Sequence, residues 1–224
     1  MPTPARSPLM ANGVTAFAPQ FDDAEQQRTA SNLGIWIFLA TEILFFGVLF
    51  AAYAITRVRF PEAFAAGSRL TNLPLAGANT AVLVTSSLTM ALGVHAARRG
   101  ARQALVGWLS LTVALGCAFL AIKAVEYRFD YLEHLVPSLN FRFAGPQADQ
   151  VELFFYMYFF ITGVHALHVL IGIGCIATIA VMASRDTFSP DYFTPVDVTG
   201  LYWHLVDVIW LFVFPVLYLI SRSS

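Results

Sequence analysis

The sequence predicts an all-α integral membrane protein, a bundle of five transmembrane helices. Of its 224 residues, 58% are hydrophobic and only 12% are charged, whereas about a quarter of the residues in a soluble domain are charged. A helix of about 20 apolar residues is long enough to cross the hydrocarbon core of a bilayer. Five segments meet this requirement, and charged and turn-forming residues gather in the breaks between them. The expected spans are residues 31–55, 73–97, 103–127, 151–183 and 196–220, and residues 1–30 are expected to form a flexible polar tail.

The first span carries a single carboxylate, Glu42, eleven residues after its predicted start at residue 31. At a rise of 1.5 Å per residue, Glu42 lies about 17 Å into the span, near the middle of the membrane. A carboxylate at that depth is costly unless it faces protein or water and has a partner. Two interpretations stay open: a proton-transfer or lipid-linked site, and a protonated side chain that forms a hydrogen bond within a helix interface.

Polar residues in the second and third spans suit helix packing. Asn79 opens a run of small and weakly polar residues, which is typical of helices that approach closely and form hydrogen bonds with each other. In the third span Lys123 and Glu126 are one helical turn apart, so they can neutralise each other as an ion pair near the membrane face. The stretch 128–150 that follows is longer than an ordinary connection. It is expected to cap the bundle or to contact a partner.

The fourth and fifth spans each contain two polar residues three positions apart, His165 with His168 and His204 with Asp207. Residues at this spacing share one face of a helix. Asp207 lies as far from the start of its span as Glu42 does from its own. If the five helices pack together, these five side chains are expected to form one polar layer near the middle of the membrane.

Other classes of function are weaker interpretations of the same residues. A haem protein would use His165 and His204 as axial ligands, but both also suit ordinary hydrogen bonding. A dinuclear carboxylate site would need repeated Glu-x-x-His motifs, which do not occur. A transporter remains possible because of the intramembrane charges and Pro215, which interrupts the fifth span. The sequence has no basic run typical of nucleic-acid binding, no phosphate-binding glycine loop, no nucleophile elbow and no cysteine cluster.

Four separated motifs occur in order along the chain. They are TEILFF at 41–46, NTAVL at 79–83, GVHALHVLIG at 163–172 and YWHLVDVIWLF at 202–212. Together they resemble subunit III of haem-copper cytochrome c oxidases, in the short, five-helix form found in bacteria. The resemblance covers nearly everything from residue 33 to residue 220.

This resemblance implies an accessory, non-redox subunit of a proton-pumping terminal oxidase that reduces oxygen with electrons from cytochrome c. Such a subunit packs mainly against subunit I, stabilises it, supports proton uptake and holds phospholipid. Haem and copper are then expected in the partner subunits and not in this chain. Subunit II, and possibly a small subunit IV, are further expected partners.

The matching motifs also imply roles for single residues. Glu42 corresponds to the buried glutamate of the family that reacts with hydrophobic carbodiimides, which makes it a lipid- or proton-related residue. Glu126 corresponds to the acidic residue that ends the next-but-one helix. The remaining intramembrane polar residues are expected to form a buried hydrogen-bonded framework together with Glu126: Asn79, His165, His168, His204 and Asp207.

Two related families remain alternatives, subunit III of quinol oxidases and the accessory membrane protein of nitric oxide reductases. The chain lacks the first two helices of the larger subunits III, so the lipid sites built there are not carried over. Lysine and arginine counts do not settle the orientation, whereas the family implies a cytoplasmic amino terminus and a periplasmic carboxyl terminus. The short form, without an apolar targeting segment, favours a bacterial plasma membrane over a mitochondrion.

Overall fold

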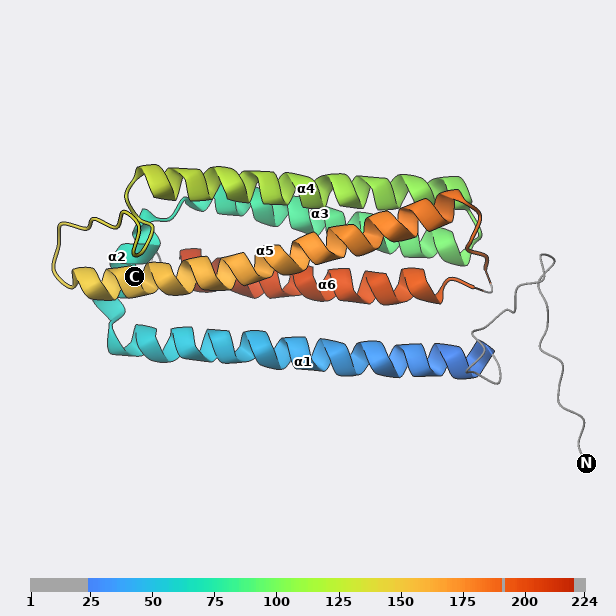
Figure 1. Ribbon diagram of the computed structural model, residues 1–224, viewed down its shortest axis with the longest axis horizontal. Coiled ribbons are helices and arrows are strands. Elements are labelled where there is room, and N and C mark those ends of the chain that lie inside the picture. The colour runs from blue at the N-terminus through green and yellow to red at the C-terminus, as the bar shows by residue number, and fades with distance from the viewer. Residues whose placement is uncertain (1–23, 191, 220–224) are drawn as a thin grey trace, which may run out of the picture.

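The computed structural model describes residues 24–190 and 192–219, and helices make up most of them (Figure 1). The helices are α1 (Ala24–Arg59), α2 (Pro61–Leu70), α3 (Leu73–Arg98), α4 (Arg102–Leu132), α5 (Ala148–Ser184) and α6 (Thr194–Phe214), which continues into a short π-helix, η1 (Pro215–Leu219). Five of these helices are long and apolar enough to cross a membrane. The predicted all-α class and the five predicted spans are therefore confirmed.

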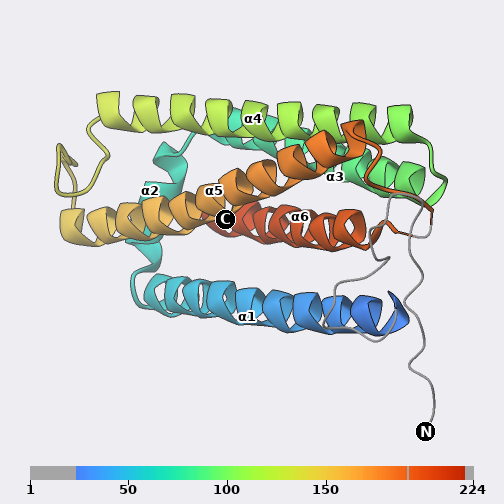
Figure 2. The same cartoon turned by 45° about the vertical axis from the view of Figure 1, so that its right-hand side comes forward.

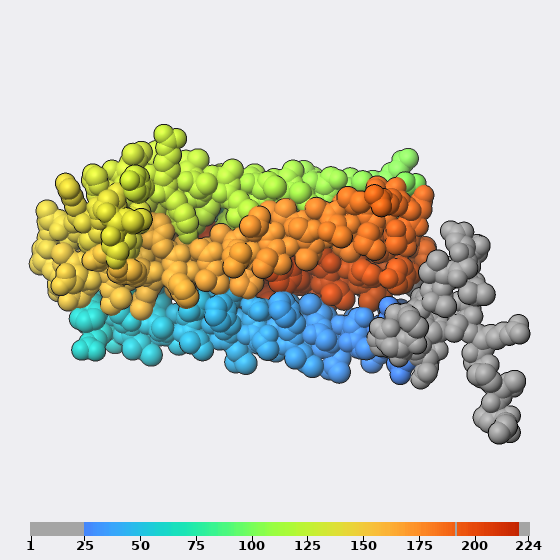
Figure 3. All heavy atoms as spheres, viewed as in Figure 1, coloured from blue at the N-terminus to red at the C-terminus, as the bar shows by residue number. Residues whose placement is uncertain are grey.

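Four of the long helices form a closed ring, and the fifth lies outside it. Helix α3 packs against α4 and α6, and α5 packs against the same two helices from the other side. Helix α1 lies outside the ring along α6, as Figures 1 and 2 both show. In the space-filling view α1 forms a separate band along one edge of the molecule (Figure 3). A single helix attached to a four-helix ring leaves room for a cavity between α1 and the ring.

Local signals fix the turns between spans. The side chain of Asn72 accepts a hydrogen bond from the backbone nitrogen of Leu75 at 3.2 Å, which caps the start of α3. The turn from α3 to α4 needs a backbone angle φ of +67° at residue 100, and a glycine occupies it. There the backbone nitrogen of Ala101 donates to the carbonyl of Ala96 at 3.0 Å, as in a helix C-cap.

The helices are longer than predicted at several ends. Helix α1 begins at Ala24, so residues 24–30 are helical and do not belong to a flexible tail; the rest of the predicted tail, residues 1–23, lies outside the described residues. Helices α4 and α5 extend into the stretch predicted as a loop and reduce it to residues 133–147. At these ends the helices continue beyond their apolar segments into charged residues. Helix boundaries that are placed where the apolar residues stop are therefore too short.

Helix α2 lies in the break between the first two predicted spans, and it begins at Pro61. A proline at the first helical position suits a helix start, since its missing N–H would be unpaired there anyway. The short helix buries Phe64 and Gly67 against the bundle, where Gly67 adjoins the ring of Phe154 on α5. Pro215 interrupts the fifth span as the sequence indicates, because α6 changes to the π-helix η1 at that residue.

Candidate functional site

Glu42 of α1 and His168 of α5 form an intramembrane acid–imidazole pair. The Nε2 atom of His168 lies 3.0 Å from the Glu42 carboxylate, and the two side chains are 16% and 17% exposed. Nδ1 of His168 lies 2.8 Å from the carbonyl oxygen of Val164, one turn earlier on α5. The ring of Phe46 on α1 packs edge-on against the imidazole, with 5.3 Å between ring centroids. This pair joins α1 to the four-helix ring.

The hydrogen bonds of His168 define what the pair can do chemically. A carbonyl oxygen only accepts, so Nδ1 carries a proton toward Val164. Nε2 then either accepts a proton from a protonated Glu42 or donates to the Glu42 carboxylate as part of an imidazolium ion. In both arrangements the pair holds one mobile proton and is neutral overall. Neutrality explains how a carboxyl group and an imidazole persist near the middle of a membrane.

A cavity of about 480 Å³ adjoins this pair, between α1 and the two ring helices that face it. Its lining is mostly apolar and consists of Ile35, Phe38, Glu42, His168, Ile171, Cys175, Val198, Thr199 and Tyr202. The Tyr202 hydroxyl donates to the backbone carbonyl of His168 at 3.0 Å, which fixes the wall beside the imidazole. The cavity therefore presents one acid–imidazole pair to an apolar space.

A second polar group, fully buried, joins α4, α5 and η1. Lys123 Nζ lies 3.0 Å from Glu126, 2.7 Å from the Tyr218 hydroxyl and 3.2 Å from the Tyr158 hydroxyl. Both tyrosines also donate to Glu126, at 2.7 and 2.8 Å, and the Tyr158 hydroxyl lies 3.2 Å from Asp130. All five side chains are buried. The predicted Lys123–Glu126 ion pair therefore forms, and it lies inside the bundle.

The structure does not hold the single polar layer that the spacing predicted. His204 Nδ1 forms a hydrogen bond with the Ser87 hydroxyl of α3 at 2.8 Å, and not with Asp207. Together with Asp207 it lines a cavity between α3 and α6, on another side of the bundle from the Glu42–His168 pair. His165 and His168 share a helix but face different neighbours. The predicted layer is therefore divided into separate sites.

His165 and Asn79 occupy the interior of the ring. The His165 ring is completely buried, packed against Phe119 and Trp210 with centroids 5.6 and 5.2 Å away. Its two ring nitrogens have no hydrogen-bond partner among the described residues, and the same holds for the side-chain amide of Asn79. Because His165 packs among aromatic rings while His204 faces Ser87, the two imidazoles do not form the axial pair that a haem would need.

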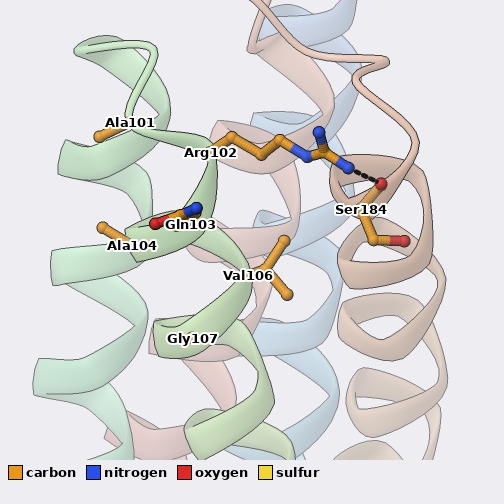
Figure 4. A pocket seen from close by; sticks show the side chains of 7 residues that line it. All are labelled: Ala101, Arg102, Gln103, Ala104, Val106, Gly107 and Ser184. Carbon is orange, nitrogen blue, oxygen red and sulfur yellow. Dashed lines mark hydrogen bonds between the residues drawn. The ribbon is translucent and has the colours of Figure 1, made fainter.

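A surface hollow lies at the opposite end of the bundle from α2, and Arg102 is part of its lining. Figure 4 shows its side chain reaching from the start of α4 to the backbone carbonyl of Ser184 at the end of α5. The same guanidinium lies 2.6 Å from the Asp186 carboxylate. Both side chains are largely exposed, so this contact joins two helix ends at the surface and is expected to contribute little to stability.

Among the described residues, no three His, Cys, Asp or Glu side chains are grouped as metal ligands would be.

Comparison with known proteins identifies the family. The family model for cytochrome c oxidase subunit III matches residues 20–222. The chain belongs to the cytochrome c oxidase subunit III family. It is thus a multi-pass membrane protein of the haem-copper oxidases, an accessory subunit III that works with partner oxidase subunits.

Individual relatives of this subunit III carry two kinds of name. The chain is 34% identical to a cytochrome c oxidase subunit 3 of Corynebacterium diphtheriae, over 91% of this chain and 95% of the relative. It is 31% identical to the quinol oxidase subunit 3 of Bacillus subtilis, over 86% of this chain and 88% of the relative. A cytochrome bo(3) ubiquinol oxidase subunit 3 of Pseudomonas putida is 30% identical over 84% and 85%.

Some site residues of this subunit III were not found from the sequence. Ser87 belongs to the run of small and weakly polar residues after Asn79, yet it forms a hydrogen bond with His204. Tyr158 and Tyr218 both contact Lys123, which their positions in the sequence do not indicate. Buried tyrosine hydroxyls need hydrogen-bond partners, so tyrosines in apolar spans were a usable signal. No spacing rule within one helix indicates which charged residue on another helix they meet.

Proposed function

We propose that this subunit III serves a terminal oxidase that takes electrons from cytochrome c, as a non-redox subunit that stabilises subunit I. The relative named cytochrome c oxidase subunit 3 is 34% identical over nearly its whole length, which favours this electron donor. Haem and copper then belong to the partner subunits. The principal contact is subunit I, with subunit II and a small subunit IV as further members of the complex.

The observation that carries the proton- and lipid-related part of this proposal is the Glu42–His168 pair beside an apolar cavity. The 3.0 Å contact allows a proton to move between the carboxyl group and Nε2 without a change in the net charge of the pair. The cavity of about 480 Å³ has walls suited to an acyl chain, and we assign it to a membrane phospholipid. Glu42 is thus the residue of this chain that we connect with proton uptake and lipid.

We infer the orientation from the family to which the chain belongs. We propose that the amino terminus lies in the cytoplasm and the carboxyl terminus in the periplasm of a bacterium, with the chain in the plasma membrane. The start of α1 and the end of α6 lie at opposite ends of the bundle, which is compatible with this assignment (Figure 1).

Quinol oxidase subunit III is the second candidate, because the relatives from Bacillus subtilis and Pseudomonas putida are nearly as similar as the one from Corynebacterium. The two candidates differ in the electron donor of the partner subunits. Nothing in the geometry of the Glu42 cavity depends on that donor.

A pull-down from native membranes tests the proposal. The tagged chain is isolated in mild detergent, a reduced-minus-oxidised spectrum is recorded, and the co-purifying subunits are identified by mass spectrometry. We expect haem-copper oxidase bands with subunits I and II, and oxygen consumption driven by reduced cytochrome c. Consumption driven only by quinol would transfer the assignment to the second candidate. A colourless chain isolated alone would refute both.

A further inference from the structure

A groove runs along the outer surface between α3 and α6. It consists of two adjoining cavities of about 390 and 310 Å³ that share Ala91 and His204 in their walls. At its mouth Arg98 and Asp197 form an exposed ion pair at 3.1 Å, and at its inner end lies Asp207. The groove thus leads from the end of the bundle where α6 begins to the middle of the α6 span.

The carboxylate of Asp207 is buried without a hydrogen bond of its own. The residue is only 5% exposed, and neither carboxylate oxygen has a hydrogen-bond partner among the described residues. Ser87 lines the same cavity, but its hydroxyl lies 2.8 Å from His204 Nδ1 and is within hydrogen-bond geometry of neither carboxylate oxygen. The chain by itself therefore leaves a strong acceptor unsatisfied at the wall of an open groove.

The depth of Asp207 restricts what can satisfy it. The residue is thirteen positions after Thr194 in a span of 26 residues, which is the middle of the span. Water and lipid headgroups lie at the ends of such a span, and acyl chains have no hydrogen-bond donor. An unsatisfied polar group in hydrocarbon costs several kcal/mol. A donor at that depth comes either from a side chain of a docked helix or from water that enters along the groove, and the variants described below distinguish the two.

The shape of the groove suits a helix. Its rims are exposed apolar side chains, Val84 and Leu88 on α3 and Val208 and Leu211 on α6, between 46% and 60% exposed. The small residue Ala91 lies between the two cavities, and small residues let another transmembrane helix approach closely. Apolar rims around one buried acceptor are typical of a helix contact that is specified by a single hydrogen bond.

We propose that the α3–α6 groove is the face on which a transmembrane helix of a partner oxidase subunit docks, and that this helix donates a hydrogen bond to Asp207 from a hydroxyl, amide or indole group. This inference rests on the proposed function, because it needs partner subunits in the same membrane. It adds the face and the chemistry of the contact. The acyl chain of a bound lipid has no hydrogen-bond donor at the depth of Asp207. A second copy of this chain on the same face would occupy the groove, and the oxidase subunits would then have to bind another face.

The test uses the complex purified through a tag on this chain. Asp207→Leu removes the acceptor and keeps the number and branching of the side-chain heavy atoms, and Asp207→Asn retains a hydrogen-bonding group. Asn79→Leu is the matched control, because Asn79 is a buried polar residue of α3 that lines neither cavity. The ratio of haem to tagged chain is followed while the detergent is made harsher. We expect Asp207→Leu to weaken retention of the haem subunits about tenfold, as the loss of one hydrogen bond would. Asp207→Asn and Asn79→Leu are expected to retain them.

Two outcomes separate this inference from the proposed function. If the unaltered chain brings haem subunits with it and Asp207→Leu does so equally well, the groove assignment is refuted while the proposed function stands. If the unaltered chain brings none, both are refuted.

A photo-crosslinking residue covers the case in which the Asp207 variants fail to accumulate. Placed at Leu88 on the groove rim, it is expected to form an adduct with another oxidase subunit, whereas the same residue at the exposed Val125 of α4 is not. Adducts only with lipid, adducts with a second copy of this chain, or equal adducts from both positions would overturn the proposal.

Discussion

Trp203 provides the sharpest test of how the ring of helices is packed. Its indole is completely buried, and its Nε1 donates to the Ser86 hydroxyl at 3.1 Å. Two glycines lie against it, Gly116 on α4 and Gly172 on α5. The tryptophan of α6 thus fills a space that exists because its neighbours lack side chains.

Adding a methyl group at Gly172 forces these helices apart. An alanine Cβ there would lie 2.8 and 2.9 Å from two indole carbons of Trp203 and 3.3 Å from a ring carbon of Tyr202. Carbon atoms pack at about 3.5–4.0 Å, so the contact must open by roughly 0.7 Å or more. Overpacking of this kind costs about 1–3 kcal/mol, and the better helix propensity of alanine offsets up to about 1 kcal/mol of it. We expect Gly172→Ala to lower the free energy of unfolding by about 1–2 kcal/mol.

Gly174 on the same helix is the matched control. An added Cβ at Gly174 would meet nothing within 4 Å, so Gly174→Ala should gain helix propensity without a clash and be neutral or slightly stabilising. Unfolding of the full chain by SDS in mild-detergent micelles, followed by tryptophan fluorescence, measures both variants. Equal stability of the two variants would refute the packing argument.

Three further predictions concern the polar groups. Lys123→Met should destabilise the chain by roughly 3–5 kcal/mol in the same unfolding assay, because it leaves the buried Glu126 without its counter-ion. Adding Glu126→Gln should restore much of this lost stability. A double variant as unstable as the single variant would contradict this. Glu42→Gln should abolish labelling of the chain by a hydrophobic carbodiimide. Glu62→Gln, at an exposed position of α2, should leave the labelling intact. Persistent labelling of the Glu42 variant would show that another carboxyl group reacts. Arg102→Ala should cost less than about 1 kcal/mol, and less still at high salt, because its ion pair is exposed; a larger loss would mean that its contact with the end of α5 has a greater role.

The sequence by itself determined the fold class and the five spans. A transmembrane helix satisfies its own backbone hydrogen bonds, so length and apolar composition of one segment are enough to predict it. The same local information missed α2, a ten-residue helix whose burial depends on Phe154 of α5. The sequence also identified the candidate site residues, because a charged or imidazole side chain within an apolar span can be recognised whichever way it faces in the fold.

Only the tertiary structure decided which of these residues meet. His165 and His168 are three positions apart, yet one packs between Phe119 and Trp210 and the other reaches Glu42. The spacing gives their separation around one helix, but the rotation of that helix against its neighbours is set by contacts between helices. Packing between helices thus divided the single predicted layer into an acid–imidazole pair, an aromatic core and an open groove. The helix rotations that decide this depend on contacts between residues far apart in the sequence.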